Sequence, residues 1–492
     1  MKHRTAALML LSALLLASCG EAAGTPAGEN KETDAQPGET AAVTEEDTYV
    51  YDSLPADLDL GGAAVSIHVR GDANSFLEVS AEQTGEVLDD AIYNRNKSVE
   101  ERLNVVLNPI QGAGWEKYSQ DMTKVRSTIM SGDNAYQIIA GWRASVPSLA
   151  LDGCFRNLPD YKYLDTAKPW WTQSAVEGMN VGGTLCFVTG DISIITDLGG
   201  SYVLFMNDRV ASEYDISGVT DSVLDGSWTL DRLISVIKSV GKDVNGDSKR
   251  DDGDYYGLIL DTYNSADAFL TAADIHQIAL DKDGTPVYTE QTERLSRLME
   301  KIYPLYYSEG YDSYQQGDVA KGVSMFNGGQ GLFTVRELDT ARDDFRNMVD
   351  SYTILPMPKL DDAQENYAVC AFNGATLWGI PTSNPDPDTS CAVMEALASA
   401  SYNDVTPVYF ETCLQDKYAR NEITIRMLEI IRDGMYVDSE YLYAPLFGNT
   451  CYVVRDLISS KKSDVASWYA KNSKKVQKEI DKTMEKLAAL EG

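Results

Sequence analysis

Histidine is scarce in this sequence of 492 residues, and the short motifs of common enzyme sites are missing. Only three histidines occur, His3, His68 and His276, and no two of them lie close together in sequence. A His-based metal site or a Ser-His-Asp triad therefore cannot be identified. The patterns GxSxG, HExxH and GxxxxGK[ST] do not occur either. We expect a protein that is not an enzyme.

Positive charge is also in short supply. The chain has 42 Lys and Arg residues against 75 Asp and Glu residues, which gives a formal net charge of −33. A surface with so much negative charge repels phosphate backbones and anionic lipid headgroups. The composition therefore predicts no nucleic-acid partner and favours neutral ligands or cations.

Long apolar runs are absent, because no stretch reaches the roughly 18 consecutive apolar residues of a membrane-spanning helix. The run from residue 6 to residue 17 follows Lys2 and Arg4 and has the length of a secretory signal. It ends in Leu16-Ala17-Ser18-Cys19, which resembles the bacterial lipobox, where the signal is removed and the cysteine is acylated, for example with palmitate. We expect residues 1–18 to be a lipoprotein signal peptide. An ordinary signal peptide beside an incidental cysteine is the alternative.

The segment after Cys19 is small, polar and acidic. It cannot bury enough apolar surface to offset the entropy lost on ordering. Residues 19–57 are therefore predicted to be a disordered acidic tether. The protein would then be lipid-anchored at the cell membrane and face the extracellular or periplasmic side.

Six further cysteines follow Cys19, and none has CxxC spacing. An even number in an exported chain permits up to three disulfides, whereas a large body also accommodates buried thiols. Both interpretations stay open for Cys154, Cys186, Cys370, Cys391, Cys413 and Cys451.

The body of the chain alternates strand and helix patterns. Residues 65–69 alternate as a strand does, and residues 118–129 have apolar side chains on one helical face that ends before Gly132. The apolar stretch AYQIIAGW predicts another strand. Such alternation is typical of a parallel sheet covered by helices, with ligands bound at the carboxyl ends of the strands. In this stretch that end is Trp142-Arg143.

A second unit of the same kind begins at SYVLFMN, residues 201–207. The following SWTLDRLISVIKSVG predicts a helix with Thr229 as its N-cap and Gly241 as its C-cap. The long pattern of residues 464–490 predicts a C-terminal helix that packs on the second unit, with its lysines on a solvated face.

The sequence DVNGDSKRDDGD, residues 243–254, contains oxygen-bearing side chains at the ligand positions of a twelve-residue EF-hand loop. Position 6 is Ser248 instead of glycine, and position 12 is an aspartate instead of glutamate. Because Gly246 stands at position 4 and an aspartate closes the loop, it resembles the calcium loops of dockerins more than those of signalling EF-hands. We expect a structural Ca²⁺ ion, and a solvated acidic loop is the alternative. The expected ligands are Asp243, Asn245, Asp247, Lys249 through its carbonyl, Asp251 and Asp254.

The order of these parts resembles the extracellular solute-binding lipoproteins of ABC importers, of the sugar- and oligosaccharide-binding family 1 type. The resemblance depends on SYVLFMND, on the acidic loop leading into YGL, and on YTILPMPK at 352–359, and it covers residues 60 to about 400. The order of Trp228 and Thr229 is reversed relative to that family. The resemblance implies an α/β, two-lobed periplasmic-binding-protein-like (type II) fold with hinge crossings near 192–203 and 358–378. The implied lobes are an N-terminal lobe of residues 58–198 and 365–415, and a C-terminal lobe of residues 199–358 and 416–492.

The implied function is capture of a sugar or oligosaccharide by hinge closure of a monomer and delivery to the permease subunits of an ABC transporter. Sugar sites combine aromatic rings with polar side chains that bond each buried hydroxyl. A surface glycan-degrading lipoprotein or a non-transport glycan-binding adhesin is the alternative, and another polar solute stays open. The candidate ligand-binding residues, chosen at strand ends and at the crossings, are Trp142, Arg143, Asp191, Tyr202, Asn327, Gln330 and Trp378.

Overall fold

All helices and strands described below belong to one compact unit, residues 52–492. The signal peptide, Cys19 and most of the tether predicted for 19–57 lie outside the described residues. The computed structural model describes residues 49–307, 309–371, 374–414, 422–437 and 439–490.

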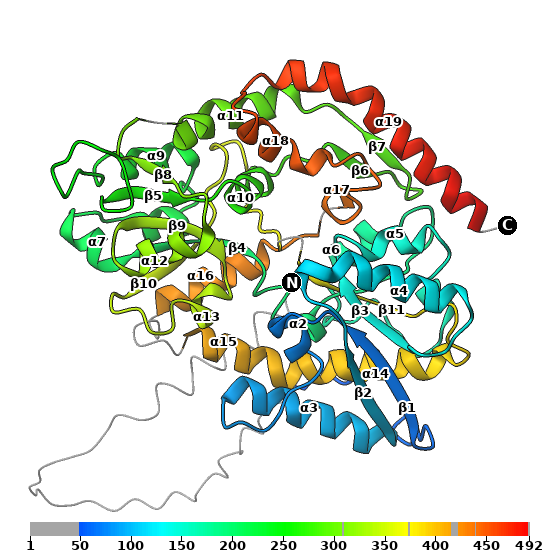
Figure 1. The fold of residues 1–492 in the computed structure, drawn as a ribbon. Helices are drawn as coiled ribbons and strands as arrows, with labels where there is room; N and C mark the ends of the chain where they lie inside the picture. Colours follow the sequence, from blue (N-terminus) through cyan, green and yellow to red (C-terminus); the bar gives the residue numbers. More distant parts are fainter. Residues whose placement is uncertain (1–48, 308, 372–373, 415–421, 438, 491–492) are drawn as a thin grey trace, which may run out of the picture. The chain divides into compact units, whose positions relative to one another are not determined.

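The first sheet has four strands in the order β11-β3-β1-β2 (Figure 1). Its alternating strand is confirmed, since Val65, Ile67 and Val69 are fully buried. Strand β1 pairs in parallel with β2 and β3, whereas β11 comes from far along the chain and runs antiparallel to β3. The strand bounds are β1 (Ala63–Val69), β2 (Val105–Gln111), β3 (Ile138–Trp142) and β11 (Thr376–Gly379).

Six helices accompany this sheet. In α4 the predicted apolar face is buried, and the helix ends before Gly132, whose φ of 76° needs a glycine or a strained residue. The apolar spacing of three and four residues therefore located both the face and the end of this helix. The helix bounds are α2 (Ala73–Leu77), α3 (Val87–Leu103), α4 (Tyr118–Met130), α5 (Val146–Ala150), α6 (Gln173–Met179) and α14 (Pro387–Ala400).

The second sheet has five strands in the order β10-β4-β9-β5-β8. Strand β5 is parallel to β8 and β9, and β4 is antiparallel to both β9 and β10. The carboxyl ends of β5 and β9 therefore lie at the same edge as the amino end of β4. The strand bounds are β4 (Tyr202–Asn207), β5 (Tyr256–Leu260), β8 (Ser313–Gln315), β9 (Gly331–Glu337) and β10 (Tyr352–Pro356).

Helix α9 shows where local sequence rules hold and where they fail. Thr229 is its N-cap, as predicted, because the threonine side chain accepts a hydrogen bond from the backbone N–H of Arg232. The prediction for Gly241 is wrong, since α9 ends at Ile237. Glycine is needed there because a Cβ would lie 1.9 Å from the carbonyl oxygen of Tyr311. The helices beside the second sheet are α7 (Asp208–Glu213), α8 (Val219–Leu224), α9 (Leu230–Ile237), α10 (Asn264–Ala272), α11 (Thr292–Tyr307), α12 (Val319–Asn327) and α13 (Thr340–Asp343).

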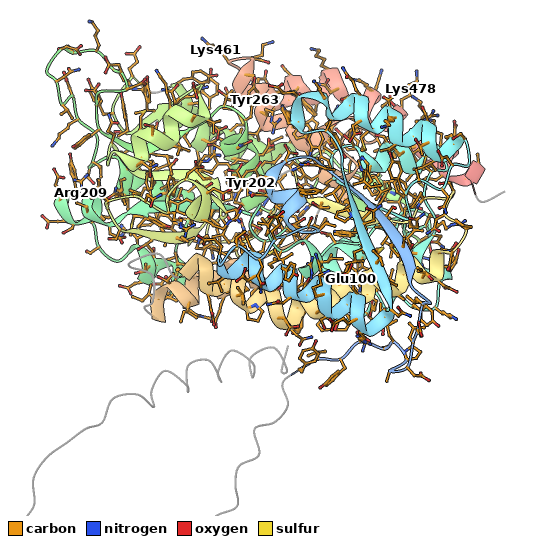
Figure 2. The ribbon with its side chains drawn as sticks, turned by 60° about the horizontal axis from the view of Figure 1, so that its bottom comes forward. Glu100, Tyr202, Arg209, Tyr263, Lys461 and Lys478 are labelled. Carbon is orange, nitrogen blue, oxygen red and sulfur yellow. The ribbon has the colours of Figure 1, made fainter. Side chains whose placement is uncertain are left out.

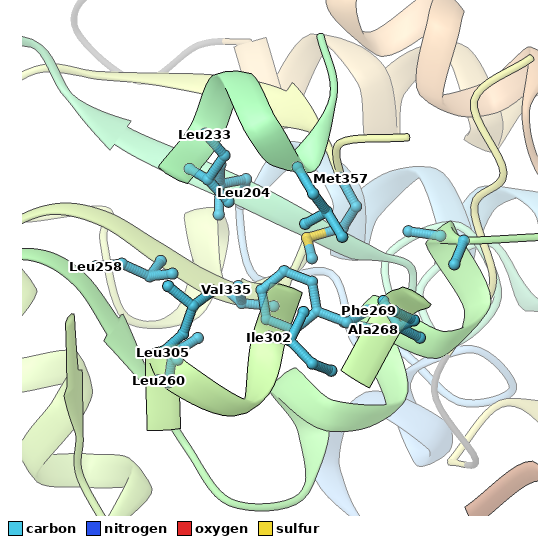
Figure 3. Packing of buried hydrophobic residues seen from close by; sticks show 14 of the residues in the cluster. Leu204, Leu233, Leu258, Leu260, Ala268, Phe269, Ile302, Leu305, Val335 and Met357 are labelled. Carbon is cyan, nitrogen blue, oxygen red and sulfur yellow. The ribbon is translucent and has the colours of Figure 1, made fainter. Parts of the chain in front are cut away.

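A large apolar core lies between the second sheet and its helices (Figure 3). Leu204 and Leu258 on the strands pack with Leu233 from α9 and Ile302 from α11, and all four are fully buried. Dense packing of this kind transmits displacements instead of absorbing them. The residues at the ends of these strands are thereby held in fixed positions.

The C-terminal part of the chain connects both halves of the fold. The first residues of α19, including Tyr469, pack in the core of the second sheet, whereas Val476 and Ile480 pack in the core of the first. The prediction that this helix packs on the part of the fold that begins at residues 201–207 is therefore correct only for its first turns. Figure 1 shows α19 passing from α11 and α18 towards α5. The remaining elements are β6 (Ile278–Leu280), β7 (Pro286–Tyr288), α15 (Thr406–Leu414), α16 (Glu422–Asp433), α17 (Ser439–Leu442), α18 (Val453–Ser459) and α19 (Val465–Leu490).

The described cysteines are buried free thiols: Cys154, Cys186, Cys370, Cys391 and Cys451. Burial raises the pKa of Cys186 and of Cys391 to about 12. The side chain of Cys413 lies outside the described residues. Among the described helices, none combines the length and the apolar character needed to cross a bilayer.

Candidate functional site

The carboxyl edge of the first sheet presents a cluster of aromatic rings beside an arginine. The rings of Trp142, at the end of β3, and Trp115, after β2, meet edge to face at 4.6 Å between centroids. The guanidinium of Arg70, directly after β1, lies 5.9 Å from the Trp142 ring centroid. Trp115 is 64% exposed. The buried indole N–H of Trp142 has no acceptor among the described residues, so it is available to a ligand oxygen.

Trp142 owes its position to local contacts. The hydroxyl of Tyr118, at the start of α4, accepts a hydrogen bond from the Trp142 backbone N–H at 2.7 Å, and the two rings pack edge to face. Arg70 also forms an ion pair with Asp72. These contacts fix the direction of the Trp142 ring, while Trp115 remains open on its outer face.

The corresponding edge of the second sheet presents a polar network with one exposed ring. Asn264 donates to Glu337 at 3.0 Å, and Glu337 is paired at 2.8 Å with Arg336. The carboxylate of Asp261 accepts the backbone N–H groups of Tyr263 and Asn264, which shapes the turn after β5. Tyr263 is 56% exposed. This edge therefore combines an aromatic surface with groups that donate and accept hydrogen bonds.

A buried polar chain joins the two edges. The guanidinium of Arg143 lies 4.9 Å from the ring centroid of Tyr441, whose hydroxyl donates to Asp267 at 3.0 Å. Arg455 pairs with the same carboxylate and lies over the Tyr263 ring at 5.3 Å. Burial raises the pKa of Asp267 to about 7, and the bonds from Arg455 and Tyr441 oppose that rise. The edges of the two sheets thus face each other, with Tyr441 between them.

The structure brings some of the sequence-predicted residues to these edges, but it buries the side chains of Arg143 and Tyr202. Trp142 lies on the first edge, but Arg143 is 1% exposed and donates to the carbonyl oxygen of Ala371. Tyr202, at the amino end of β4, is buried near Tyr441, and burial raises its pKa well above the usual value. Figure 2 shows Tyr202 in the middle of the fold and Tyr263 nearer its upper edge.

The other predicted residues lie elsewhere. Asn327 and Gln330 precede β9, so they are at the edge opposite Glu337, where their side chains donate to the backbone carbonyls of Asp344 and Asp252. Trp378 is fully buried and donates to Ser193 at 2.6 Å. Asp191 is buried and accepts a hydrogen bond from Thr406 at 2.7 Å. A ligand role for each of these residues stays a prediction.

Sequence reasoning missed Arg70, Trp115, Tyr263 and Asn264. The rule that selected Trp142, a side chain directly after a buried strand, also applies to Arg70 after residues 63–69 and to the turn after residues 256–260. Trp115 comes four residues after its strand, and only the observed packing against Trp142 places it at the site.

The acidic loop of residues 243–254 follows α9. Asp243 accepts the backbone N–H groups of Gly246 and Ser248, and fully buried Asp254 accepts those of Val244 and Asp251. Ser248 has a φ of 60°, so the EF-hand position that usually requires glycine has the expected left-handed backbone. Within the described parts of the chain, no three Asp, Glu, His or Cys side chains converge as a metal cluster. The backbone at Ser248 thus matches an EF-hand turn, whereas the carboxylates of Asp243 and Asp254 bond to the loop's own backbone.

No family model and no curated protein matches the chain. Solved structures do match. The galacto-N-biose-/lacto-N-biose I-binding protein of the ABC transporter from Bifidobacterium longum, in complex with lacto-N-biose, is 12% identical with a TM-score of 0.58, and the match covers 86% of this chain and 98% of that one.

Two further matches have the same character. A cyclo/maltodextrin-binding protein complexed with maltotetraose is 9% identical, with a TM-score of 0.58 over 85% of this chain and 97% of that one. A maltose/maltodextrin-binding domain from Bdellovibrio bacteriovorus bound to maltotriose is 13% identical, with a TM-score of 0.54 over 86% and 100%. At these identities the likeness establishes the fold. The chain has the two-lobed α/β fold of periplasmic sugar-binding proteins, the type II fold that the sequence predicts.

Proposed function

We propose that this chain is an extracellular solute-binding protein that captures a sugar or oligosaccharide between its lobes and delivers it to an ABC transporter permease. The fold supports this proposal, as do the oligosaccharides bound in the similar structures. The observation that carries it is that each facing sheet edge combines an aromatic ring with polar side chains. Trp142 stands beside Arg70 on one edge, and Tyr263 stands beside Asn264 on the other.

These groups suit a carbohydrate. A sugar ring has apolar C–H faces that pack on aromatic rings and hydroxyls that need hydrogen-bond partners. The indole N–H of Trp142 and the buried Nε of Arg336 have no acceptor among the described residues, so both can donate to hydroxyl oxygens. A ligand that contacts both edges stabilises the closed arrangement of the lobes, and the permease can recognise that arrangement.

Calorimetric titration of residues 52–492 with mono- and oligosaccharides, together with product analysis of each mixture, tests the proposal. We expect a saturable complex with intact sugar, and we expect Trp142→Ala and Tyr263→Ala each to weaken it roughly 10-fold or more. Tyr93→Ala is the matched control, because this half-buried tyrosine of α3 contacts Lys97 and neither edge.

Three other results would redirect the proposal. Cleaved sugar would indicate a glycan-degrading enzyme, although the similar structures are those of binding proteins. Binding without any change in the radius of gyration would favour an adhesin. Failure of every sugar to bind would move the ligand to another class of polar solute.

We also propose that Cys19 is acylated and holds the protein at the outer side of the cell membrane. The lipobox-like Leu16-Ala17-Ser18-Cys19 supports this proposal. Expression of the full chain should place it in the detergent phase of a Triton X-114 partition, and Cys19→Ser should move it to the aqueous phase. Equal partitioning of both proteins would exclude the lipid.

We propose in addition that the loop of residues 243–254 binds a structural Ca²⁺ ion. The left-handed Ser248 and the oxygen-bearing side chains at the EF-hand positions support it. Calcium should raise the melting temperature relative to chelator, and Asp247→Asn should reduce that rise, whereas Asp283→Asn at an exposed turn should not. An identical melting temperature with calcium and with chelator would exclude the ion.

A further inference from the structure

The outer face of α19 has a row of lysines, here named the basic stripe: Lys471, Lys474, Lys475, Lys478, Lys482 and Lys486. All six side chains belong to exposed residues. At 100° of helix rotation per residue their spacing confines them to an arc of about 120°. They therefore project from one side of the helix, in a row along its length.

Contacts on the opposite face fix the rotation of this helix. Val476 and Ile480 are buried in the core of the first sheet. The hydroxyl of Tyr469 donates to Gln277 at 2.7 Å, and that of Thr483 donates to the backbone carbonyl of Leu446 at 3.0 Å. The basic stripe is consequently held towards solvent, and Figure 2 shows Lys478 on the same upper edge of the fold as Lys461.

The basic stripe is an exception in an acidic protein. Residues 461–490 contain eight lysines and four acidic residues, which gives +4, in a chain with a net charge of −33. Within the described residues, Lys482 is paired with Glu479 at 3.6 Å, and the other five lysines of the stripe form no ion pair within 4 Å. Asp456 interacts electrostatically with Lys471 and Lys475, and the exposed Glu485 lies within the same arc, so the stripe keeps a net positive charge but is not free of acidic neighbours.

We propose that the basic stripe binds the anionic headgroups of a lipid bilayer and so determines which face of the protein lies against the membrane. From Lys471 to Lys486 the helix extends roughly 22 Å, at 1.5 Å per residue. A planar anionic surface can contact such a straight row of lysines at once, whereas a protein partner would need acidic groups at the same spacing. The lipid proposed at Cys19 would hold the body within reach of such a surface.

Repulsion by the rest of the chain does not prevent this contact at physiological salt. The Debye length is about 8 Å at 0.15 M salt, which is shorter than the 10–12 Å diameter of a helix with its side chains. A bilayer touching the stripe therefore interacts mainly with the lysines. At 0.01 M salt the Debye length is about 30 Å, and the acidic body behind α19 repels the same bilayer. Binding should hence be strongest at intermediate salt.

Co-sedimentation with vesicles tests the proposal. The protein is residues 52–492, the compact unit that contains every described helix and strand. Vesicles of phosphatidylglycerol and phosphatidylcholine in a ratio of 3:7 are compared with pure phosphatidylcholine at 0.01, 0.15 and 1 M NaCl. We expect binding to the anionic vesicles only, with a maximum at 0.15 M.

Two charge-matched variants show which lysines are responsible. The stripe variant combines Lys475→Glu, Lys478→Glu and Lys482→Glu, and we expect it to lower the partition coefficient at least about 100-fold at 0.15 M. The control variant changes the exposed Lys117, Lys124 and Lys238 to glutamate, which gives the same net charge and an intact stripe. It should bind as the unmodified protein does. A variant with glutamine at 475, 478 and 482 should show an intermediate loss.

Several results would overturn the proposal. These are absence of binding at every salt concentration, or equal losses in the stripe and control variants. Cross-linking of the stripe to an acidic membrane protein, in the absence of vesicle binding, would assign it to a protein partner instead. None of these readouts involves a sugar, so failure here leaves the proposed function standing.

Discussion

Replacement of Glu78 by glutamine tests how one buried carboxyl group, which bonds to the segments between the two sheets, changes the free energy of unfolding with pH. Glu78 follows α2, is 1% exposed, and bonds to residues on both connections between the sheets. Its carboxylate accepts the backbone N–H of Thr196 at 2.7 Å and the hydroxyls of Thr196 and Thr376 at 3.2 and 3.1 Å. Thr196 precedes β4, and Thr376 begins β11. Glutamine has nearly the same shape and can keep these contacts without a charge.

The magnitude follows from the pKa of Glu78. Burial raises this pKa from its ordinary 4.5 to about 7, against the hydrogen bonds from Thr196 and Thr376. The folded protein therefore holds the proton more tightly than the unfolded chain. The resulting stabilisation is complete below pH 4.5 and is lost as the pH rises through about 7. Between pH 5 and pH 8 this one group should lower the free energy of unfolding by about 2–3 kcal/mol.

Urea unfolding at pH 5, 6, 7 and 8 measures this contribution for both proteins. We expect the free energy of unfolding of the unmodified chain to fall about 2–3 kcal/mol more than that of Glu78→Gln over this range. The comparison uses how the free energy of unfolding changes with pH in each protein. A cost of the altered hydrogen bonds that does not depend on pH therefore drops out. The other buried carboxyls titrate in both proteins and largely cancel. Parallel pH profiles would refute the raised pKa of Glu78.

Three further substitutions test single features of the fold. Ser248→Gly should raise the free energy of unfolding by about 0.5–1 kcal/mol, because glycine adopts the left-handed backbone without strain; an unchanged urea midpoint would contradict this. Gly241→Ala should cost about 1–3 kcal/mol, since its Cβ would collide with the Tyr311 carbonyl, and a neutral result would show that the loop can move away. Arg455→Met should cost about 3–5 kcal/mol at pH 8, because the buried Asp267 carboxylate loses its paired guanidinium and must either take up a proton or stay ionised without it. The loss should be smaller at pH 5, because the pKa of Asp267 is about 7; equal losses at both pH values would contradict this assignment.

The sequence predicted those parts of the fold that depend on local periodicity and capping. Alternation identified β1, helical spacing identified the buried face of α4, and a side-chain oxygen before an apolar run identified Thr229 as a cap. Gly241 was misassigned as a helix end because it follows an apolar helical pattern, as a C-cap glycine does. A glycine that is needed because a distant segment of backbone passes close to it looks the same in the local sequence. Such approaches depend on contacts between residues that are far apart in sequence.

The site was predictable only in part, for a similar reason. The end of a buried strand locates a residue on a sheet edge, which was sufficient for Trp142. It does not show whether the side chain turns inwards, as that of Arg143 does. Nor does it show which end of a later strand faces the first lobe, and Gln330 was wrongly expected at that end because it precedes β9. Periodicity likewise gave the buried face of α19 without showing that two separate cores cover it.

That last feature restricts how the lobes can move. A continuous helix resists stretching, and α19 has one end packed on each core. A hinge motion that separated the two anchorages would pull Val476 and Ile480 out of their core, at about 1.5–3 kcal/mol for each side chain. Rotation about an axis close to α19 avoids this cost. Any relative motion of the two cores that keeps both ends of α19 packed is therefore confined to rotation about an axis close to this helix.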